Sequence, residues 1–348
     1  MTVDAPPAES PAVEKPPAVA MTEMICGSLW LGRLLPLVAE LRIADALAAG
    51  PHTPTELAAA SGADVGALTR CLRALASVGV FAEDGTGAYV NTPLSETLRE
   101  DAPISLRAMA ALWGLPDHLK AWDSLGDAVR GADSAPAWEL AHGVPLFAYF
   151  AANPAEAGLF QRAMTAFSGV EAQAVAAAYD FSGIGTLVDV GGGHGLLLAT
   201  ILEANPSLRG VLFELPFMLE GARTALAERG VADRCEIAVG DFFQAVPAGD
   251  AHILKNIVHD FDDEQAREIL RSCRRAVAPG GRVLVVQEAL PPGNAPSFGK
   301  LLDIQMLVIG GRERTADEYR ALFAAAGYEL TRVIPTQGPQ HVLEGIAR

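Results

Sequence analysis

The stretch LVDVGGGHG, residues 187–195, places four glycines directly after a short, mainly apolar run. A new apolar run begins at Leu196, so the pattern predicts a strand, a glycine-rich turn and a helix. In an open α/β sheet, ligands bind where strands end at their carboxyl termini. The glycine stretch is therefore predicted to bring its backbone close to a bound ligand.

The residues of this stretch exclude two common phosphate-binding motifs. A Walker loop needs Gly-Lys-Ser/Thr, whereas His194-Gly195-Leu196 stands here. The dinucleotide fingerprint G-x-G-x-x-G would need glycine at position 196, which is leucine. Asp189 would repel a pyrophosphate and attract a cationic group. The stretch thus favours a ligand with a positive centre over a dinucleotide.

The chain after Gly185 alternates apolar strands with helices, which predicts a parallel sheet covered on both faces. The last two strands are joined by Thr336-Gln337-Gly338-Pro339 and are expected to form an antiparallel hairpin. We therefore predict an α/β fold with a Rossmann-like, seven-stranded sheet over residues 181–348. Strands are expected at 186–190, 210–215, 235–239, 252–255, 282–286, 330–335 and 341–346, and helices at 196–204, 217–229, 263–278 and 315–326.

Three further segments precede this domain. Residues 1–18 are rich in proline and alanine, which is typical of a disordered tail. Residues 19–100 contain a helix, a capping box at Thr53-Pro54-Thr55-Glu56, a second helix and a hairpin around Asp84-Gly85, a winged-helix pattern. Residues 101–180 form a helical, aromatic-rich linker that is expected to contribute to an acceptor site.

The net charge of the winged-helix segment helps to choose between two possible functions, DNA binding and dimerisation. Residues 21–100 hold five arginines and no lysine against nine acidic residues, and the whole chain carries a net charge of −16. Nucleic acid is therefore not an expected partner. A dimerisation module is favoured, and a DNA-binding regulator is the alternative.

The cysteines and the apolar segments of the sequence indicate the cellular compartment of the protein. The four cysteines form no C-x-x-C pair, which favours reduced thiols. No secretory signal opens the chain, and no run of about 18 uninterrupted apolar residues occurs. A cytoplasmic protein without a membrane span is expected.

Acidic residues follow the next two strands. Glu214 ends the second strand, where a carboxylate accepts hydrogen bonds from ribose hydroxyls. Gly240-Asp241-Phe242 follows the third strand, and Asp241 could accept from an adenine amino group while Phe242 covers the ring. A ligand that contains adenosine and a positive centre but no phosphate fits S-adenosylmethionine (SAM).

At this point the chain resembles class I SAM-dependent O-methyltransferases. It is similar to the plant caffeate/flavonoid O-methyltransferase family in its bacterial natural-product branch, which includes carminomycin and mitomycin methyltransferases. The stretches that carry the resemblance are LVDVGGGHG, FELP, GDFF, ILKNIVHDFDDEQ, APGGRVLVV, GGRERT, FQRAM and the winged-helix module, and they cover nearly the whole chain.

The resemblance implies roles for particular residues. It implies a homodimer that uses SAM without a metal. Its implied cofactor-binding residues are Ser168, Asp189, Gly191, Gly193, Glu214, Leu215, Gly240, Asp241, Phe242, Lys255 and Asn256, and its implied acceptor-binding residues are Phe160, Met164, Asp260 and Met306. Met164 and Met306 could equally belong to the core.

His259 is the candidate general base. It follows the fourth strand, and the pKa of histidine suits proton abstraction from a phenol near neutrality. The family supplies carboxylates that orient this histidine from a loop and from a strand end. Glu313 in GGRERT matches the loop position, whereas the strand position holds Gln287 with Glu288 one residue later. Since successive strand residues face opposite sides, either Glu288 or a neutral Gln287 would serve.

Two alternatives remain at this stage. Asp260, Asp262 and Asp263 could hold Mg²⁺, but acidic residues are also favoured at a helix N-terminus, which is the preferred interpretation. The departure at Gln287 also allows a SAM-fold enzyme with other chemistry, such as the family's anthracycline 10-hydroxylase.

Overall fold

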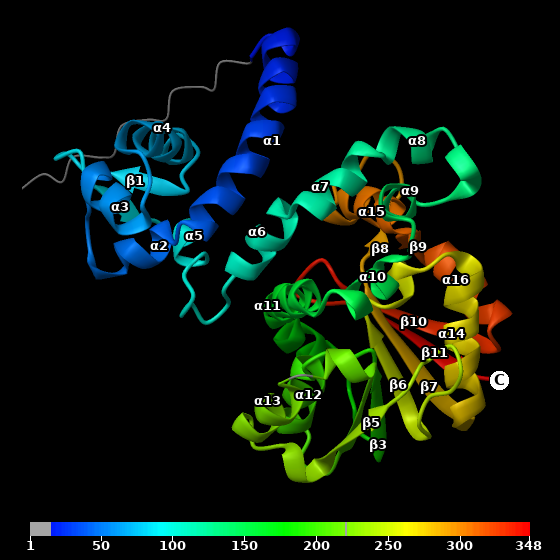
Figure 1. Cartoon of the computed structure of the whole chain (residues 1–348). Helices are drawn as coiled ribbons and strands as arrows, with labels where there is room; N and C mark the ends of the chain where they lie inside the picture. Colours follow the sequence, from blue (N-terminus) through cyan, green and yellow to red (C-terminus); the bar gives the residue numbers. More distant parts are fainter. Residues whose placement is uncertain (1–14, 220) are drawn as a thin grey trace, which may run out of the picture. The chain divides into compact units, whose positions relative to one another are not determined.

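The computed structural model describes residues 15–219 and 221–348. The chain divides into two compact units, residues 1–96 and residues 97–348 (Figure 1). Most of the predicted tail, residues 1–14, lies outside the described residues. Its last two positions, Pro17 and Ala18, already belong to the first helix.

The first unit contains the predicted helices and hairpin. Thr53 and Glu56 form the capping box, and Asp64 caps the next helix by accepting from the Ala67 N–H. Ala82 pairs with Val90 in the antiparallel hairpin. The elements are α1 (Pro17–Glu40), α2 (Ile43–Ala46), η1 (Leu47–Ala49), α3 (Pro54–Ser61), α4 (Val65–Ala76), β1 (Phe81–Glu83), β2 (Tyr89–Asn91) and α5 (Pro93–Glu96).

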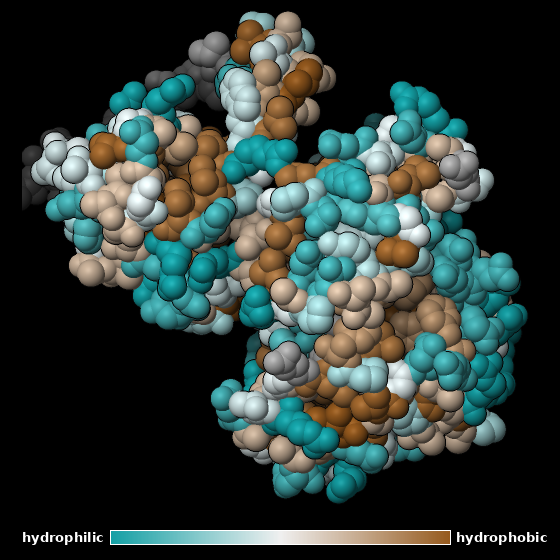
Figure 2. Space-filling view, viewed as in Figure 1, coloured by the Kyte–Doolittle hydropathy of each residue, from teal (hydrophilic) through white to brown (hydrophobic). Residues whose placement is uncertain are grey.

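Helix α1 exposes much apolar surface. By length and composition alone it could cross a membrane, although the sequence predicts no span. The helix nevertheless carries Glu23, Arg33 and Glu40. Figure 2 shows apolar surface along this helix, and its exposed large side chains include Met21, Met24, Ile25, Leu29 and Trp30.

The second unit begins with helices that enclose an aromatic core. Trp138 is fully buried and packs edge-on against Tyr149, while Phe150 contacts Phe160. This segment was predicted to be helical, and that prediction is confirmed. Its elements are α6 (Arg107–Gly114), α7 (Pro116–Asp123), α8 (Leu125–Val129), η2 (Ala132–Ser134), α9 (Ala137–His142), α10 (Leu146–Ala152) and α11 (Pro154–Ala178).

A seven-stranded sheet forms the centre of this unit, in the order β10-β11-β7-β6-β3-β4-β5. β11 runs antiparallel to both β7 and β10, and the remaining neighbours are parallel. The predicted fold class is thereby confirmed. The strands are β3 (Thr186–Val190), β4 (Arg209–Glu214), β5 (Cys235–Val239), β6 (Gly249–Lys255), β7 (Val277–Gln287), β10 (Tyr328–Pro335) and β11 (His341–Ala347).

Alternating strand residues build two cores, one on each face of the sheet. Leu187 and Leu212 pack on the face covered by α11, α12 and α13, whereas Val188 and Val211 pack on the face covered by α14 and α16 (Figure 1). The helices of this sheet domain are α12 (Leu196–Ala204), η3 (Pro216–Met218), α13 (Ala222–Glu228), η4 (Ala232–Arg234), η5 (Val258–Asp260), α14 (Asp263–Ala276), α15 (Phe298–Ile309) and α16 (Ala316–Ala325).

Several predicted elements have different bounds. β6 begins at Gly249 rather than at residue 252, and β10 begins at Tyr328 rather than at residue 330. The two largest differences have a local cause. The helix predicted at 217–229 is a 3₁₀ turn followed by α13, because Gly221 takes a left-handed conformation with φ of 83° before the helix begins. β7 begins at Val277 rather than at residue 282, because Val277 already pairs with Gly249 of β6. A short parallel pair, β8 (Ala289–Leu290) and β9 (Arg314–Thr315), lies outside the main sheet.

Candidate active site

A cavity of about 400 Å³ opens at the carboxyl ends of β3, β4 and β6. This is the place where a parallel sheet is expected to bind ligands. The structure brings twelve of the predicted site residues together around it: Phe160, Met164, Ser168, Asp189, Gly191, Gly193, Glu214, Lys255, Asn256, His259, Asp260 and Met306.

The glycine stretch lines this cavity in a conformation that needs glycine. Gly191, Gly193 and Gly195 have φ angles of 73°, 57° and 78°, which other residues rarely adopt. A Cβ atom on Gly191 would also come within 2.5 Å of the Ile257 side chain. The turn therefore requires glycine to bring its backbone to the cavity wall.

Asp189 lies buried beside the glycines with one carboxylate oxygen, Oδ2, that has no hydrogen-bond partner among the described residues. Burial raises the pKa of Asp189 to about 7, although Lys255 acts in the opposite direction. A buried carboxylate that lacks a partner is costly, and a cationic ligand would compensate it. This residue fits the positive centre that the sequence predicts.

Glu214 at the end of β4 is the second buried acid of the cavity. Its Oε2 accepts a hydrogen bond of 2.6 Å from the Leu215 N–H. Burial raises the pKa of Glu214 to about 7, and the backbone N–H groups of Leu215 and Gly193 lower it. The remaining carboxylate oxygen can accept from a hydroxyl group.

Lys255 is held by an ion pair that the sequence did not predict. Its Nζ lies 2.8 Å from Oε2 of Glu171 and donates to Oγ of Ser168 at 3.0 Å. Gln340 donates to the other oxygen of Glu171 at 2.8 Å. The lysine therefore lies at the cavity with its charge already balanced by a buried partner.

The predicted adenine-binding residues do not line the cavity. Asp241 accepts from the Phe243 N–H at 2.9 Å, and Phe242 packs against Phe243 and Phe261. Gly240 donates to the Glu214 carbonyl at 3.1 Å, so this loop stays next to the end of β4. Leu215 is likewise outside the lining, and the roles of these four residues stay predictions.

His259 sits on η5 at the cavity and is almost fully buried. Its Nδ1 lies 2.5 Å from Oε1 of Glu313, and its Nε2 lies 3.5 Å from Oδ1 of Asp260. Burial lowers the pKa of His259, but the carboxylates of Asp260 and Glu313 outweigh burial and raise it above its ordinary value. Burial also raises the pKa of Asp260 to about 6. The predicted pairing of His259 with Glu313 is present.

Neither predicted strand partner contacts His259. The side-chain oxygen of Gln287 accepts a hydrogen bond of 3.0 Å from the Tyr319 hydroxyl. Glu288 accepts hydrogen bonds from Ser297 and from the Gly299 N–H, so it closes the start of α15. Because β7 ends at Gln287, the next residue turns away toward α15 and does not reach the histidine.

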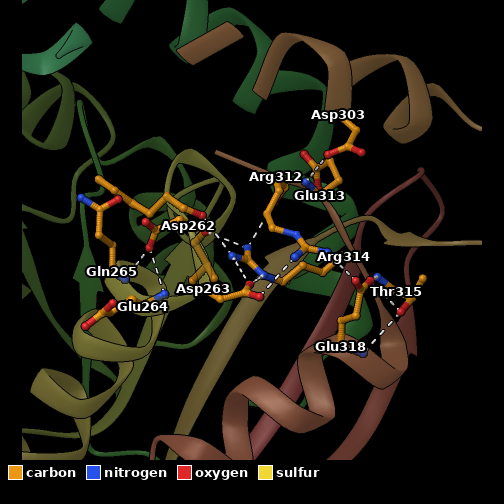
Figure 3. A network of polar contacts seen from close by, with 12 residues as sticks. Asp262, Asp263, Glu264, Gln265, Asp303, Arg312, Glu313, Arg314, Thr315 and Glu318 are labelled. Carbon is orange, nitrogen blue, oxygen red and sulfur yellow. Dashed lines mark hydrogen bonds and ion pairs between the residues drawn. The ribbon is translucent and has the colours of Figure 1, made fainter. Parts of the chain in front are cut away.

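A fully buried arginine, Arg314, joins the loop of Glu313 to the turn of His259. Figure 3 shows Arg314 beside Asp263. Its guanidinium donates to the carbonyls of Val258 and Phe261, each at 3.0 Å, and to Asp263 at 2.9 Å. Sequence reasoning missed this residue, although it belongs to the GGRERT stretch. Arg314 therefore fixes both sides of the histidine turn.

The backbone of the same loop also touches the histidine turn. The Arg312 N–H donates to the His259 carbonyl at 2.8 Å, and Asp303 accepts from the Glu313 N–H at 2.7 Å. Gly311 permits this approach, because a Cβ atom there would lie 1.9 Å from the His259 carbonyl oxygen. The histidine and its carboxylate are thus positioned by one connected set of hydrogen bonds.

Asp262 and Asp263, which lie near His259, have hydrogen-bond and ion-pair partners within the protein that account for their positions. Asp262 caps α14 by accepting from the Glu264 and Gln265 N–H groups, and Asp263 pairs with Arg312 and Arg314. Within residues 15–219 and 221–348, no group of three or more His, Cys, Asp or Glu side chains could hold a metal ion.

The rest of the cavity is mainly apolar. Side chains from α6, α7, α10, α11 and α15 form this wall, which suits a flat, apolar ligand. Its apolar members are Leu106, Met109, Trp113, Leu146, Phe147, Phe160, Met164, Phe167, Phe298, Leu302, Met306 and Ile309. Four polar residues of this wall, His118, Gln161, Thr165 and Gln305, were not predicted.

Comparisons with known proteins agree with this geometry. The sequence models of an O-methyltransferase domain and of an O-methyltransferase dimerisation domain match residues 122–329 and 24–101. A phenazine O-methyltransferase from Lysobacter antibioticus is 43% identical over 326 residues, 93% of this chain and 94% of that protein. A mitomycin biosynthesis 6-O-methyltransferase from Streptomyces lavendulae is 38% identical over 99% of both chains.

A solved structure and one further relative complete the comparison. CalO1, a methyltransferase in calicheamicin biosynthesis solved in its S-adenosylhomocysteine (SAH) bound form, superposes with a TM-score of 0.83 at 36% identity over 95% of this chain and 98% of that one. Aclacinomycin 10-hydroxylase from Streptomyces purpurascens is 38% identical over 87% of this chain and 83% of that protein. The sequence, the fold and both domain matches therefore place this chain in the O-methyltransferase family.

Proposed function

We propose that this protein transfers a methyl group from SAM to a phenolic hydroxyl of an aromatic natural product, with His259 as the general base. The observation that carries the proposal is the buried His259–Glu313 pair, which borders the same cavity as Asp189 and the glycine stretch. The relatives whose names include O-methyltransferase support the reaction, and the SAH-bound CalO1 structure supports the cofactor.

The residues around the glycine stretch fit SAM. The unpartnered oxygen of Asp189 would face a positive charge, and Glu214 would accept from ribose hydroxyls. Ser168, Lys255 and Asn256 line the same part of the cavity. When bound, SAM supplies a methyl group on a positively charged sulfur.

His259 would remove the proton of the acceptor hydroxyl. Glu313 accepts the hydrogen bond from Nδ1–H, which leaves Nε2 as the nitrogen that can take a proton. A phenol has a pKa of about 10, so a positioned base increases the fraction of the reactive phenolate near neutral pH. Glu313 and Asp260 would then stabilise the imidazolium that forms.

A homodimer and a cytoplasmic location are part of the same proposal. The dimerisation domain at residues 24–101 and the exposed apolar surface of α1 support a homodimer. The four cysteines form no disulfide in the structure, which supports a reducing, cytoplasmic setting.

The first test is calorimetric binding of SAH to the wild type, Glu214→Ala and His259→Ala. We expect the wild type to bind, Glu214→Ala to bind more weakly and His259→Ala to bind normally. With SAM and a panel of phenols, His259→Ala should lose about 10²- to 10⁴-fold in kcat. Normal SAH binding without methyl transfer to any phenol would contradict the proposed reaction and favour hydroxylase-like chemistry. No SAH binding by the wild type would contradict the cofactor assignment.

A further inference from the structure

Among the polar side chains that line the acceptor cavity, one on α15 and one on α7 lie next to apolar residues of the wall. On α15 the lining residues recur at helical spacing, and Gln305 is polar whereas Phe298, Leu302, Met306 and Ile309 are apolar. His118 on α7 lines the same cavity and is 3% exposed. Apolar binding sites use a small number of such groups to orient their ligands.

The amide of Gln305 has a defined orientation. Nε1 of Trp122 donates to Oε1 of Gln305 at 3.0 Å. An indole N–H can only donate, so the oxygen of the amide must face Trp122 and the NH₂ group must face away from it. Among the described residues this NH₂ group makes no hydrogen bond. Gln305 therefore presents a hydrogen-bond donor that its protein surroundings do not satisfy.

His118 lies one helical turn before Trp122 on the same face of α7, and it lines the same cavity as Gln305. Its ring packs edge-on against Trp113 and Trp138, with centroid distances of 5.4 and 5.2 Å. Its Nε2 is buried and has no hydrogen-bond partner among the described residues. Burial lowers the pKa of His118 to about 4, so the ring is neutral near pH 7.

We propose that Gln305 donates a hydrogen bond to a neutral carbonyl oxygen of the acceptor, with His118 as a second polar contact. The acceptors would then be aromatic compounds that carry a carbonyl group in addition to the reacting hydroxyl, a substrate class that rests on the proposed function. Neither Gln305 nor His118 carries a positive charge, so moving a carboxylate from water to this wall would cost more than moving a carbonyl. An acceptor without the carbonyl would leave the amide unsatisfied.

Three bicyclic phenols of similar size test this inference by calorimetry on the full-length protein saturated with SAH. They are 7-hydroxycoumarin with a neutral carbonyl, 2-naphthol with none, and 6-hydroxy-2-naphthoate with a carboxylate. We expect 7-hydroxycoumarin to bind about ten-fold or more tightly than the other two. Binding of 7-hydroxycoumarin and 2-naphthol within about two-fold of each other would overturn the proposal.

Variants separate hydrogen bonding from packing. Gln305→Leu should weaken binding of 7-hydroxycoumarin about ten-fold and leave 2-naphthol unchanged, and Gln305→Glu, which can still accept from Trp122, should do the same. His118→Phe should also weaken 7-hydroxycoumarin selectively. Leu302→Met, a volume-conserving change in the same wall, should retain the preference. Equal weakening of both ligands by Gln305→Leu would show a packing role and contradict the proposal.

Methyl transfer from SAM to 7-hydroxycoumarin distinguishes the two proposals. A preference for the carbonyl ligand without methyl transfer would support the recognition by Gln305 and contradict the proposed reaction. Methyl transfer to 2-naphthol as efficient as to 7-hydroxycoumarin, together with equal binding, would support the reaction and contradict the recognition.

Discussion

Arg314 and Asp263 form an ion pair of 2.8 Å in which the arginine side chain is fully buried and the aspartate is 55% exposed. The arginine also donates to the carbonyls on both sides of His259, so it links the helix start of α14 to the histidine turn. A lysine could reach one of these oxygens but lacks the planar set of donors that serves all of them. Arg314 is therefore expected to position His259, the proposed general base.

We predict that Arg314→Lys lowers kcat about ten- to a hundred-fold while the KM for SAM changes little. Arg312→Lys is the matched control, because Arg312 pairs with the other oxygen of Asp263 from the exposed side of the same loop. Steady-state kinetics and thermal unfolding of both variants separate positioning from stability. An equal loss of kcat in the two variants would contradict a specific role of the buried Arg314 in positioning His259.

Glu313→Gln is predicted to change the pH profile of methyl transfer. The proposed base, His259, would act only when it is neutral, so the rate is expected to rise as pH rises through its pKa. The carboxylates of Asp260 and Glu313 raise that pKa against the effect of burial. Replacing one of them by an amide lowers the pKa, so the rising limb should move to lower pH while the maximal rate falls.

The control for this shift is Glu318→Gln. Glu318 lies five residues later in the capping box of α16 and does not contact His259. The same acid-to-amide change there should leave the pH profile in place. A profile that stays fixed in Glu313→Gln as well would mean that Glu313 does not tune the histidine.

Much of this fold could be predicted from the sequence because the turn residues and the pattern of apolar segments indicate the same elements. The glycines of residues 187–195 marked the first strand and its turn, and the regular alternation of apolar segments located the sheet. The predicted bounds were wrong where an element's start depended on the backbone conformation of a glycine or on pairing with a neighbouring strand. Gly221 delayed α13, and pairing with Gly249 extended β7 backward.

The candidate site was predictable where a motif fixed the residue and ambiguous where a strand ended. Glu313 followed from the GGRERT stretch, whereas the choice between Gln287 and Glu288 depended on where β7 stops and on the cap of α15. Arg314 was missed because arginine is rarely fully buried, and a sequence does not show that four acceptors surround it.

Asp189→Asn is predicted to weaken SAM binding more than SAH binding. SAM carries a positive charge on sulfur that SAH lacks, and Asp189 offers a buried oxygen without a partner. Burial raises the pKa of Asp189 to about 7, so wild-type affinity for SAM should increase as pH rises through 7 and the aspartate ionises. Calorimetry across this range should show a weaker pH dependence in the variant, where the asparagine at position 189 does not titrate. Equal losses of affinity for SAM and SAH would mean that Asp189 does not interact with the positive charge on the sulfur of SAM.

The exposed face of α1 gives the last prediction, which concerns assembly. Leu29 and Trp30 are each 62% exposed, and a contiguous apolar surface of this kind usually marks a protein interface. Because the helix lies within the dimerisation-domain match, a second copy of the chain is the expected partner. We expect light scattering to show a dimer for the wild type and a monomer for Leu29→Glu with Trp30→Glu. Val129→Glu on α8 makes the same change at another exposed apolar residue and should remain dimeric. A wild type that is monomeric at micromolar concentration would contradict the interface, since charge on α1 would then have no partner to repel.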